Sequence, residues 1–179
     1  MGMVHVAVLG HSLVPSSFCC DVPGVQISVF RKPGATWQDQ YCEEFSGFWQ
    51  GQYDLVIILL GGNDLAYVDF YPVFCRLKEF VQAALGRATR VRLCSVEPRN
   101  YDEQSRFDIT TSVFNIRRHR YNRVVSRWIR RIGQGFIDIG KPWIARQRTR
   151  DGVHFDTVAS QGLIRRFNRT IRGCFHISG

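Results

Sequence analysis

The sequence lacks any apolar run long enough to cross a membrane. Its longest run, Leu55–Leu60, has six residues, whereas a transmembrane helix needs about 20. The N-terminus shows neither the basic region nor the small-residue cleavage site of a signal peptide, and Val4–Leu9 is predicted to be a strand. Repeats, low-complexity stretches and linkers are also missing. The 179 residues are therefore predicted to form one domain, residues 1–179, without a transmembrane segment.

The cysteines show no metal-binding pattern. No CxxC pair occurs among the six of them, which are Cys19, Cys20, Cys42, Cys75, Cys94 and Cys174. Structural zinc is therefore not expected, and we predict neither a metal nor a cofactor. Reduced thiols in an intracellular, cytoplasmic protein explain this pattern most simply. Because the number is even, an oxidised extracellular protein remains an alternative.

Lysine is nearly absent from the basic residues. Only three of the 24 are lysine and 21 are arginine. They are also unevenly distributed, because residues 1–86 carry a net charge of −4 and residues 87–179 a net charge of +13. Since a guanidinium can grip phosphate through two parallel hydrogen bonds, the C-terminal half is predicted to face a polyanion. Nucleic acid, RNA above all, is the first candidate and anionic lipid the second.

Two predicted helices concentrate these arginines. A helical wheel places apolar side chains on one arc of residues 112–132 and of residues 157–175, and arginines on the opposite arc. The candidate polyanion-binding residues are Arg120, Arg123, Arg127, Arg130, Arg131, Arg165, Arg166, Arg169 and Arg172. The alternative is a solvated surface that binds nothing. The sequence leaves open whether the two rows form one patch.

Strands and helices alternate along the chain. Short apolar runs, typical of strands buried on both faces, occur at Val4–Leu9, Val25–Phe30, Asp54–Leu60, Arg90–Ser95 and Phe136–Ile139. Helical stretches are expected at about Trp37–Phe48, Tyr71–Leu85, Ser112–Ile132 and Thr157–Phe175. This alternation predicts an α/β protein with a doubly wound parallel sheet.

Residues suited to acyl transfer follow the predicted strands, where ligands bind in open α/β sheets. Ser12 follows the first strand, and Asp151 and His154 precede the last helix. A serine hydroxyl becomes nucleophilic when a base removes its proton, and His154 is the candidate base. An imidazole in that role needs a carboxylate on its other nitrogen, for which Asp151 is the candidate. The chain order of this triad is Ser, Asp, His.

The attacked carbonyl becomes an oxyanion that needs preorganised donors. The candidates are the backbone N–H of Ser12, the backbone N–H of Gly34 and the side-chain amide of Asn63. Gly34 follows the second strand, and its lack of a Cβ permits a close approach to a ligand. Asn63 lies in Gly-Gly-Asn-Asp directly after the third strand. These donors complete a predicted serine esterase site.

This arrangement resembles the SGNH hydrolases, the GDSL-like esterase and lipase superfamily. Ser12, Gly34, Asn63 and the pair Asp151 and His154 match its four motif blocks in order. The resemblance covers almost the whole chain. It implies a flavodoxin-like three-layer α/β/α sandwich around five parallel strands, and hydrolysis of an ester without metal or cofactor.

One block departs from the family pattern, in which Gly-Asp-Ser is usual. Here His11 replaces the aspartate, which is not the triad acid. His11 is either a satisfied loop histidine or a second titrating group near Ser12. Gly-His-Ser together with an arginine-rich second half resembles the esterase domains of LINE-type retrotransposon first open reading frame proteins, which accompany nucleic-acid-binding modules.

The expected function is hydrolysis of short-chain, acetyl-like esters, with a small acyl-ester substrate. The chain is too short to provide a lipase lid. One alternative is a nucleic-acid or anionic-membrane binding module with an idle esterase site. Another is a carbohydrate acetylesterase that holds an acidic glycan with the same arginines. Neither the oligomeric state nor any flanking domain can be predicted from these residues.

Overall fold

The computed structural model describes residues 2–16, 18, 20–101, 108–139 and 154–177. Its centre is a five-stranded sheet in which all neighbouring strands are parallel. The strands are β1 (Val4–Gly10), β2 (Val25–Arg31), β3 (Tyr53–Leu59), β4 (Ala88–Cys94) and β5 (Gly135–Ile137). Their order is β2-β1-β3-β4-β5, which is the flavodoxin-like order. The predicted fold class is confirmed.

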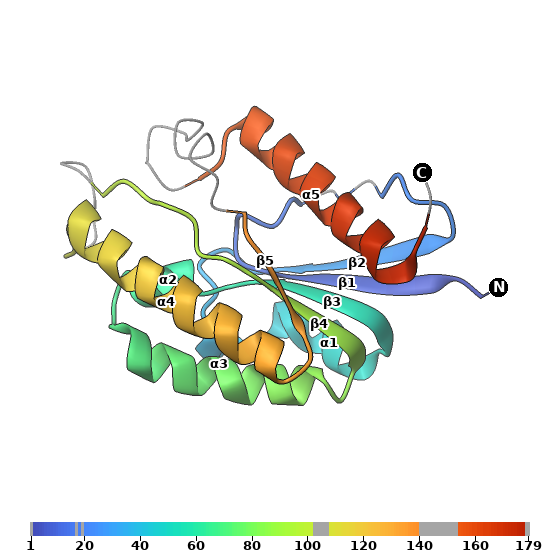
Figure 1. The fold of residues 1–179 in the computed structure, drawn as a ribbon, viewed down its shortest axis with the longest axis horizontal. Coiled ribbons are helices and arrows are strands. Elements are labelled where there is room, and N and C mark those ends of the chain that lie inside the picture. The colour runs from blue at the N-terminus through green and yellow to red at the C-terminus, as the bar shows by residue number, and fades with distance from the viewer. Residues whose placement is uncertain (1, 17, 19, 102–107, 140–153, 178–179) are drawn as a thin grey trace.

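Helices cover both faces of the sheet (Figure 1). They are α1 (Ser46–Gln50), α2 (Gly62–Leu65), α3 (Phe70–Ala84), α4 (Thr111–Arg131) and α5 (Thr157–Phe175). The first four pack against one face, and their buried side chains belong to one apolar cluster. α5 packs against the other face together with the segment after β1, and forms a second cluster. The three layers are therefore helices, sheet and helix.

The long helices follow their apolar periodicity. In α4 the side chains of Tyr121, Val125 and Ile129 are fully buried, as the wheel predicts. In α5 the buried apolar positions are Ala159, Leu163, Phe167, Ile171 and Cys174, and Asn168 is buried as well. The Asp156 carboxylate accepts a hydrogen bond from Ala159 N at 2.9 Å and caps α5, a role for which an aspartate directly before a helix is well suited.

The predicted helix over residues 37–48 is wrong. The segment forms two 3-10 turns, Trp37–Asp39 and Glu43–Phe45, followed by the short helix α1. Thr36 and Asp39 form a capping box that closes the first turn. Extended backbone at Cys42, with φ −65° and ψ 161°, then interrupts any continuous helix. Trp37 is buried against Phe80 in this layer.

The two central strands meet at the reversal point of the topology. From β1 the chain moves outward to β2, and from β3 it moves in the opposite direction to β4. β1 and β3 pair directly from Val6 with Leu55 to Gly10 with Leu59. A crevice opens beyond the carboxyl ends of strands at such a point. The segments that carry Ser12 and Asn63 begin there.

Candidate functional site

Ser12 and His154 lie in hydrogen-bond contact although they are 142 positions apart in the sequence. The distance from Ser12 Oγ to His154 Nε2 is 3.0 Å. Ser12 follows β1 and His154 lies two residues before the Asp156 cap of α5, so the fold brings both to the carboxyl edge of the sheet. A separation of about 2.6–3.2 Å is what a general base needs to remove a proton from a nucleophile.

The loop that carries Ser12 is held by the end of β2. Arg31 Nε donates to the carbonyl of Val14 at 2.9 Å, and Arg31 Nη2 donates to the carbonyl of Ser12 at 3.1 Å. Two donors of one planar guanidinium therefore fix two carbonyls of the same loop. The sequence does not reveal this role, because the contact joins the end of β2 to the loop after β1 and no local pattern shows it.

Gly34 lies in a tight turn after β2. The N–H of Ala35 donates to the Lys32 carbonyl at 3.1 Å, which places Pro33 and Gly34 at the two central positions. Gly34 has φ +78°, as the third position of a type II turn requires. Apart from its chain neighbours, no atom of the described residues lies within 4 Å of the place where its Cβ would be. The glycine is therefore required by backbone conformation and not by a lack of space.

Asn63 joins this turn to α2. Its Nδ2 donates to the carbonyl of Ala35 at 3.0 Å, and its Oδ1 accepts from Arg99 Nη1 at 3.1 Å. Two of the predicted oxyanion donors, Gly34 and Asn63, are thus held in one hydrogen-bonded assembly. Their role as oxyanion donors stays a prediction.

Asp151 lies outside the described residues, so its predicted place beside His154 stays a prediction. The structure instead reveals polar residues that follow β4, the one strand end that sequence analysis passed over. Glu97 and Arg99 are buried there, with Arg99 Nε 3.5 Å from Glu97 Oε1. Arg99 Nη1 also donates to the Tyr101 hydroxyl at 3.1 Å. Charged residues directly after a buried strand were the signal that could have found them.

His11 is a buried, neutral histidine. Its side chain is 1% exposed, and Nδ1 accepts from Leu13 N at 3.2 Å, so the ring proton of the neutral form is on Nε2. Burial is the main cause that lowers the pKa of His11 to about 3, and the positive charge of Arg99 adds to it. His11 therefore stays uncharged at neutral pH and shapes the Ser12 loop as a hydrogen-bond acceptor.

Asp64 is the opposite case. The carboxylate is 3% exposed and accepts from Trp37 N at 3.1 Å, so it ties α2 to the turn after Gly34. Burial raises the pKa of Asp64 to about 7, although the Trp37 N–H acts in the other direction. Burial therefore favours the uncharged form of both groups in the folded chain.

These two shifts should oppose each other in the pH dependence of stability. Between about pH 3 and 6.5 the unfolded chain binds a proton at His11 that the folded chain does not, so the free energy of unfolding rises with pH. Between about pH 3.8 and 7 the folded chain holds a proton on Asp64 that the unfolded chain does not, so the free energy of unfolding falls as the pH rises. Where the windows overlap, the two contributions cancel.

Urea unfolding at pH 4.5, 5.2 and 6.0, roughly mid-window, measures each contribution by removing the other. Relative to wild type, Asp64→Asn should change the slope of stability against pH by about +1.4 kcal/mol per pH unit. His11→Asn should change it by about −1.4 kcal/mol per unit. Slopes equal to that of wild type would show that neither pKa is shifted.

A cavity of about 380 Å³ opens beside Ser12. It is lined by Ser12, Leu13, Val14, Pro15, Ser16, Arg31, His154, Phe155, Ser160 and Ile164. Apolar and polar residues contribute equally to this lining, five of each, and the polar ones include both Ser12 and His154. A cavity that combines apolar walls with a few polar groups is typical of a site that binds a small ligand.

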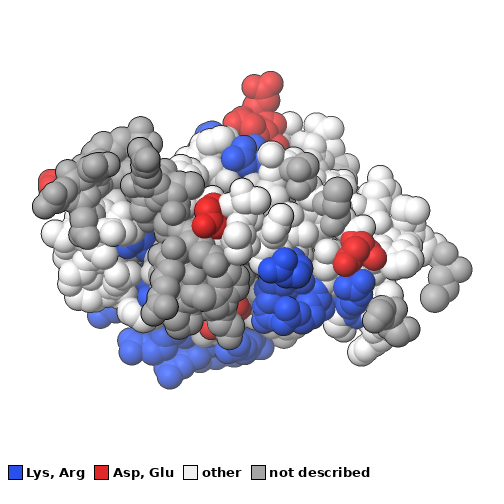
Figure 2. All heavy atoms as spheres, turned by 90° about the horizontal axis from the view of Figure 1, so that it is seen from above, with Lys and Arg blue, Asp and Glu red and all other residues white. Residues whose placement is uncertain are grey.

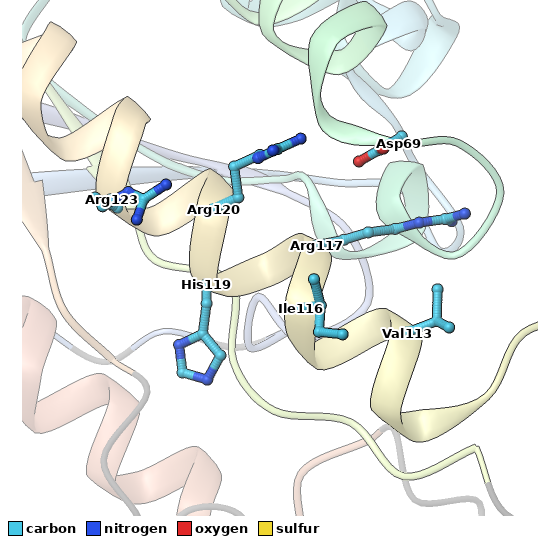
Figure 3. A pocket seen from close by; sticks show the side chains of 7 residues that line it. All are labelled: Asp69, Val113, Ile116, Arg117, His119, Arg120 and Arg123. Carbon is cyan, nitrogen blue, oxygen red and sulfur yellow. The ribbon is translucent and has the colours of Figure 1, made fainter.

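A larger hollow, of about 780 Å³, lies along α4 (Figure 3). Arg117 and Arg120 extend toward the side on which Asp69 lies, whereas His119 projects from the other side of the helix. The side chains that line this hollow do not converge on one point, and they do not include a nucleophile paired with a base. We therefore assign the chemistry to the smaller cavity, despite the difference in size.

Two further observations bear on ligands and membranes. Within the described ranges, no three His, Cys, Asp or Glu side chains come together in a way that could hold a metal ion. None of the helices in those ranges is both long and apolar enough to span a bilayer.

Comparison with known proteins decides the family. A model of the GDSL-like lipase/acylhydrolase family matches residues 10–161, which include every predicted block from the Ser12 loop to the start of α5. The chain belongs to the GDSL-like lipase/acylhydrolase family. As a member of this family it is a carboxylic ester hydrolase. Among curated proteins no significant sequence match was found.

Solved structures share the fold of this acylhydrolase. A native aryl esterase from M. smegmatis superposes with a TM-score of 0.76 at 18% identity, covering 96% of this chain and 99% of the other. A catalytic mutant of an acetylxylan esterase from Geobacillus stearothermophilus gives 0.72 at 16% identity, covering 96% and 95%. At such identities the similarity establishes the fold.

Proposed function

We propose that this acylhydrolase is a serine esterase that cleaves short-chain, acetyl-like esters. The observation that carries the proposal is the 3.0 Å contact between Ser12 Oγ and His154 Nε2. In the proposed cycle His154 takes the proton of Ser12, Oγ attacks the carbonyl, and the protonated His154 gives its proton to the leaving alcohol. Water, activated by His154, then hydrolyses the acyl-enzyme. Asp151 is proposed to orient and stabilise the imidazolium.

The oxyanion is proposed to be held by three donors. The backbone N–H groups of Ser12 and Gly34 and the side-chain amide of Asn63 fill this role. The hydrogen bond from Asn63 to the Ala35 carbonyl and the turn at Gly34 support it, because they hold two of these donors rigidly before substrate binds. No step in this cycle needs a metal or cofactor.

The acyl-length profile tests the substrate class. With p-nitrophenyl esters, kcat/KM should fall by about tenfold or more from acetate to octanoate, because a methylene that cannot be accommodated costs about 1–3 kcal/mol. The cavity beside Ser12, about 380 Å³, accepts a small acyl group and part of a leaving group. A profile that rises toward octanoate would contradict the proposed preference.

We propose polyanion binding, RNA first, as a second function of the same chain. The favouring observation is on α4, where Arg120, Arg123, Arg127, Arg130 and Arg131 are all exposed and the helix contains no Asp or Glu. The first four are spaced by three or four residues, which places a guanidinium about every 5 Å along the helix. Binding of RNA would also fit the retroelement esterase domains that the sequence resembles, and an intracellular location.

The arginines of α5 are less suited to this task. Arg165 and Arg169 are exposed, but Arg166 and Arg172 are half-buried, and Arg172 pairs with Asp21 at 3.2 Å. α4 and α5 also pack on opposite faces of the sheet, so the two rows belong to different layers. On the face that α5 covers, Lys and Arg atoms form separate groups (Figure 2). The second proposal therefore rests on α4.

Salt dependence tests this second function. Affinity for single-stranded RNA should fall steeply between 50 and 200 mM salt, by about 0.7 in logarithmic slope for each neutralised phosphate. Replacing Arg120, Arg123 and Arg127 by glutamine should lower the slope by about 2, while the same change at Arg165 and Arg169 should alter it less. Binding that ignores salt, or binding to anionic vesicles alone, would contradict the RNA proposal.

A further inference from the structure

A buried guanidinium lies directly behind the proposed oxyanion hole. Arg99 is 4% exposed, and its Nη1 donates to Asn63 Oδ1 at 3.1 Å. We propose that Arg99 is a positioning residue that fixes and polarises the side-chain amide of Asn63 for transition-state binding. This inference rests on the proposed function, since it concerns the donor that Asn63 presents to the oxyanion.

The amide of Asn63 is held from both ends. Its oxygen faces the Arg99 guanidinium and one of its N–H bonds is given to the Ala35 carbonyl at 3.0 Å. A 180° flip of the amide would place its NH₂ group against a cation and its oxygen against a carbonyl. Both contacts would be repulsive. One orientation therefore remains, and in it the second N–H is available to substrate.

Arg99 also makes this N–H a stronger donor. A cation at the amide oxygen draws electron density from the nitrogen, and hydrogen bonds in a chain polarise one another. The site is shielded from water, because Glu97, Arg99 and Tyr101 are all buried, so the effect is weakly screened. Preorganised donors of this kind need no reorganisation when charge develops on the substrate.

A contribution to folding stability does not by itself explain why an arginine is buried at position 99. A buried ion pair such as Arg99 with Glu97 costs desolvation, and apolar residues of similar volume often replace such pairs without loss. Glu97 and the Tyr101 hydroxyl, at 3.5 and 3.1 Å from Arg99, instead hold the guanidinium at a defined place. That place is behind Asn63.

Gly62 provides independent evidence that the Arg99 guanidinium is closely packed beside Asn63. A Cβ on Gly62 would clash with Arg99 Nη2, although the backbone conformation of Gly62 is not one that needs glycine. The guanidinium therefore occupies the space of a side chain next to Asn63. Gly62→Ala should displace Arg99 while keeping its charge in the protein.

A double-mutant cycle on p-nitrophenyl acetate tests the proposal. Asn63→Ala should lower kcat by about 10²–10³-fold, as loss of one oxyanion donor does. Arg99→Lys keeps a cation beside Glu97 but cannot reach all three partners, and should lower kcat about 10–100-fold with KM within about twofold. In the Asn63→Ala background Arg99→Lys should change kcat less than about threefold. Equal factors in both backgrounds would overturn the proposal.

A control variant and an NMR readout complete the test. Arg92→Lys, at a half-buried arginine of β4, is the matched control and should leave kcat unchanged. The side-chain ¹H–¹⁵N resonances of Asn63, assigned by their loss in Asn63→Ala, should shift in Arg99→Lys and Gly62→Ala but not in Arg92→Lys. An unshifted amide would overturn the proposal. If Arg99→Lys does not fold, Gly62→Ala serves in its place.

The failure of the proposed function would look different. Equal hydrolysis by wild type and Ser12→Ala would refute the serine mechanism. The Asn63 amide resonances would still report whether Arg99 fixes that side chain.

Discussion

Ser12→Ala should lower kcat for acetate esters by about 10⁴–10⁶-fold, and His154→Ala should do nearly the same. Without Oγ no acyl-enzyme forms, and without the imidazole at 3.0 Å no group removes its proton. Because the two residues act as one unit, the double variant should be no slower than either single variant. The measurement is steady-state ester hydrolysis by each variant at the same protein concentration.

Ser16→Ala is the matched control for this loss. Ser16 lines the same cavity as Ser12 and lies four residues farther along the loop. Its replacement should leave kcat within about twofold of wild type if the cavity alone does not decide the rate. Ser12→Ala activity above about a tenth of wild type would refute the nucleophile assignment.

Asp151→Asn should lower kcat by about 10⁴-fold, because an amide in place of the carboxylate favours the wrong histidine tautomer and no longer stabilises the imidazolium. Asp156→Asn is the control in the same segment. Asp156 caps α5 through Ala159 N at 2.9 Å, and asparagine caps helices about as well as aspartate. Pre-steady-state acylation rates measure both variants. Loss of activity in Asp156→Asn but not in Asp151→Asn would reverse the assignment of the triad acid.

Much of the architecture is predictable from the sequence because its information is local. All five apolar runs became parallel strands, since each is short, nearly unbroken and separated by a crossover. The carboxyl-edge rule then selected Ser12 and Asn63 as candidates, and the fold places their segments at the reversal point of the sheet. His154 could be predicted as the base from the family pattern, and the structure supplies its contact with Ser12.

Other features depend on contacts between distant segments. The helix expected over residues 37–48 fails at Cys42, where extended backbone interrupts it. Asp64 accepts a hydrogen bond from Trp37 N, and Arg31 and Arg99 reach residues that follow other strands. Periodicity and motif spacing describe one segment at a time, so they contain no signal for such pairs.

The arginine rows show the same limit. A helical wheel orders the side chains around one helix axis, but it does not show which of them contact another element. Arg117 is an example, because its Nη1 donates to the Leu65 carbonyl at 2.8 Å and belongs to the packing of α4 on α2. The exposed row from Arg120 to Arg131 is the part that remains available to a partner.

Covalent labelling of Ser12 tests the central claim most directly. A fluorophosphonate reacts with an activated serine when Oγ attacks phosphorus and fluoride leaves, which gives a tetrahedral adduct that can be mapped by peptide mass spectrometry. Wild type should carry one adduct, on Ser12, and both Ser12→Ala and His154→Ala should carry none. An unlabelled wild type, or an adduct on Ser16 or Ser160 instead, would contradict the assignment of Ser12 as the nucleophile.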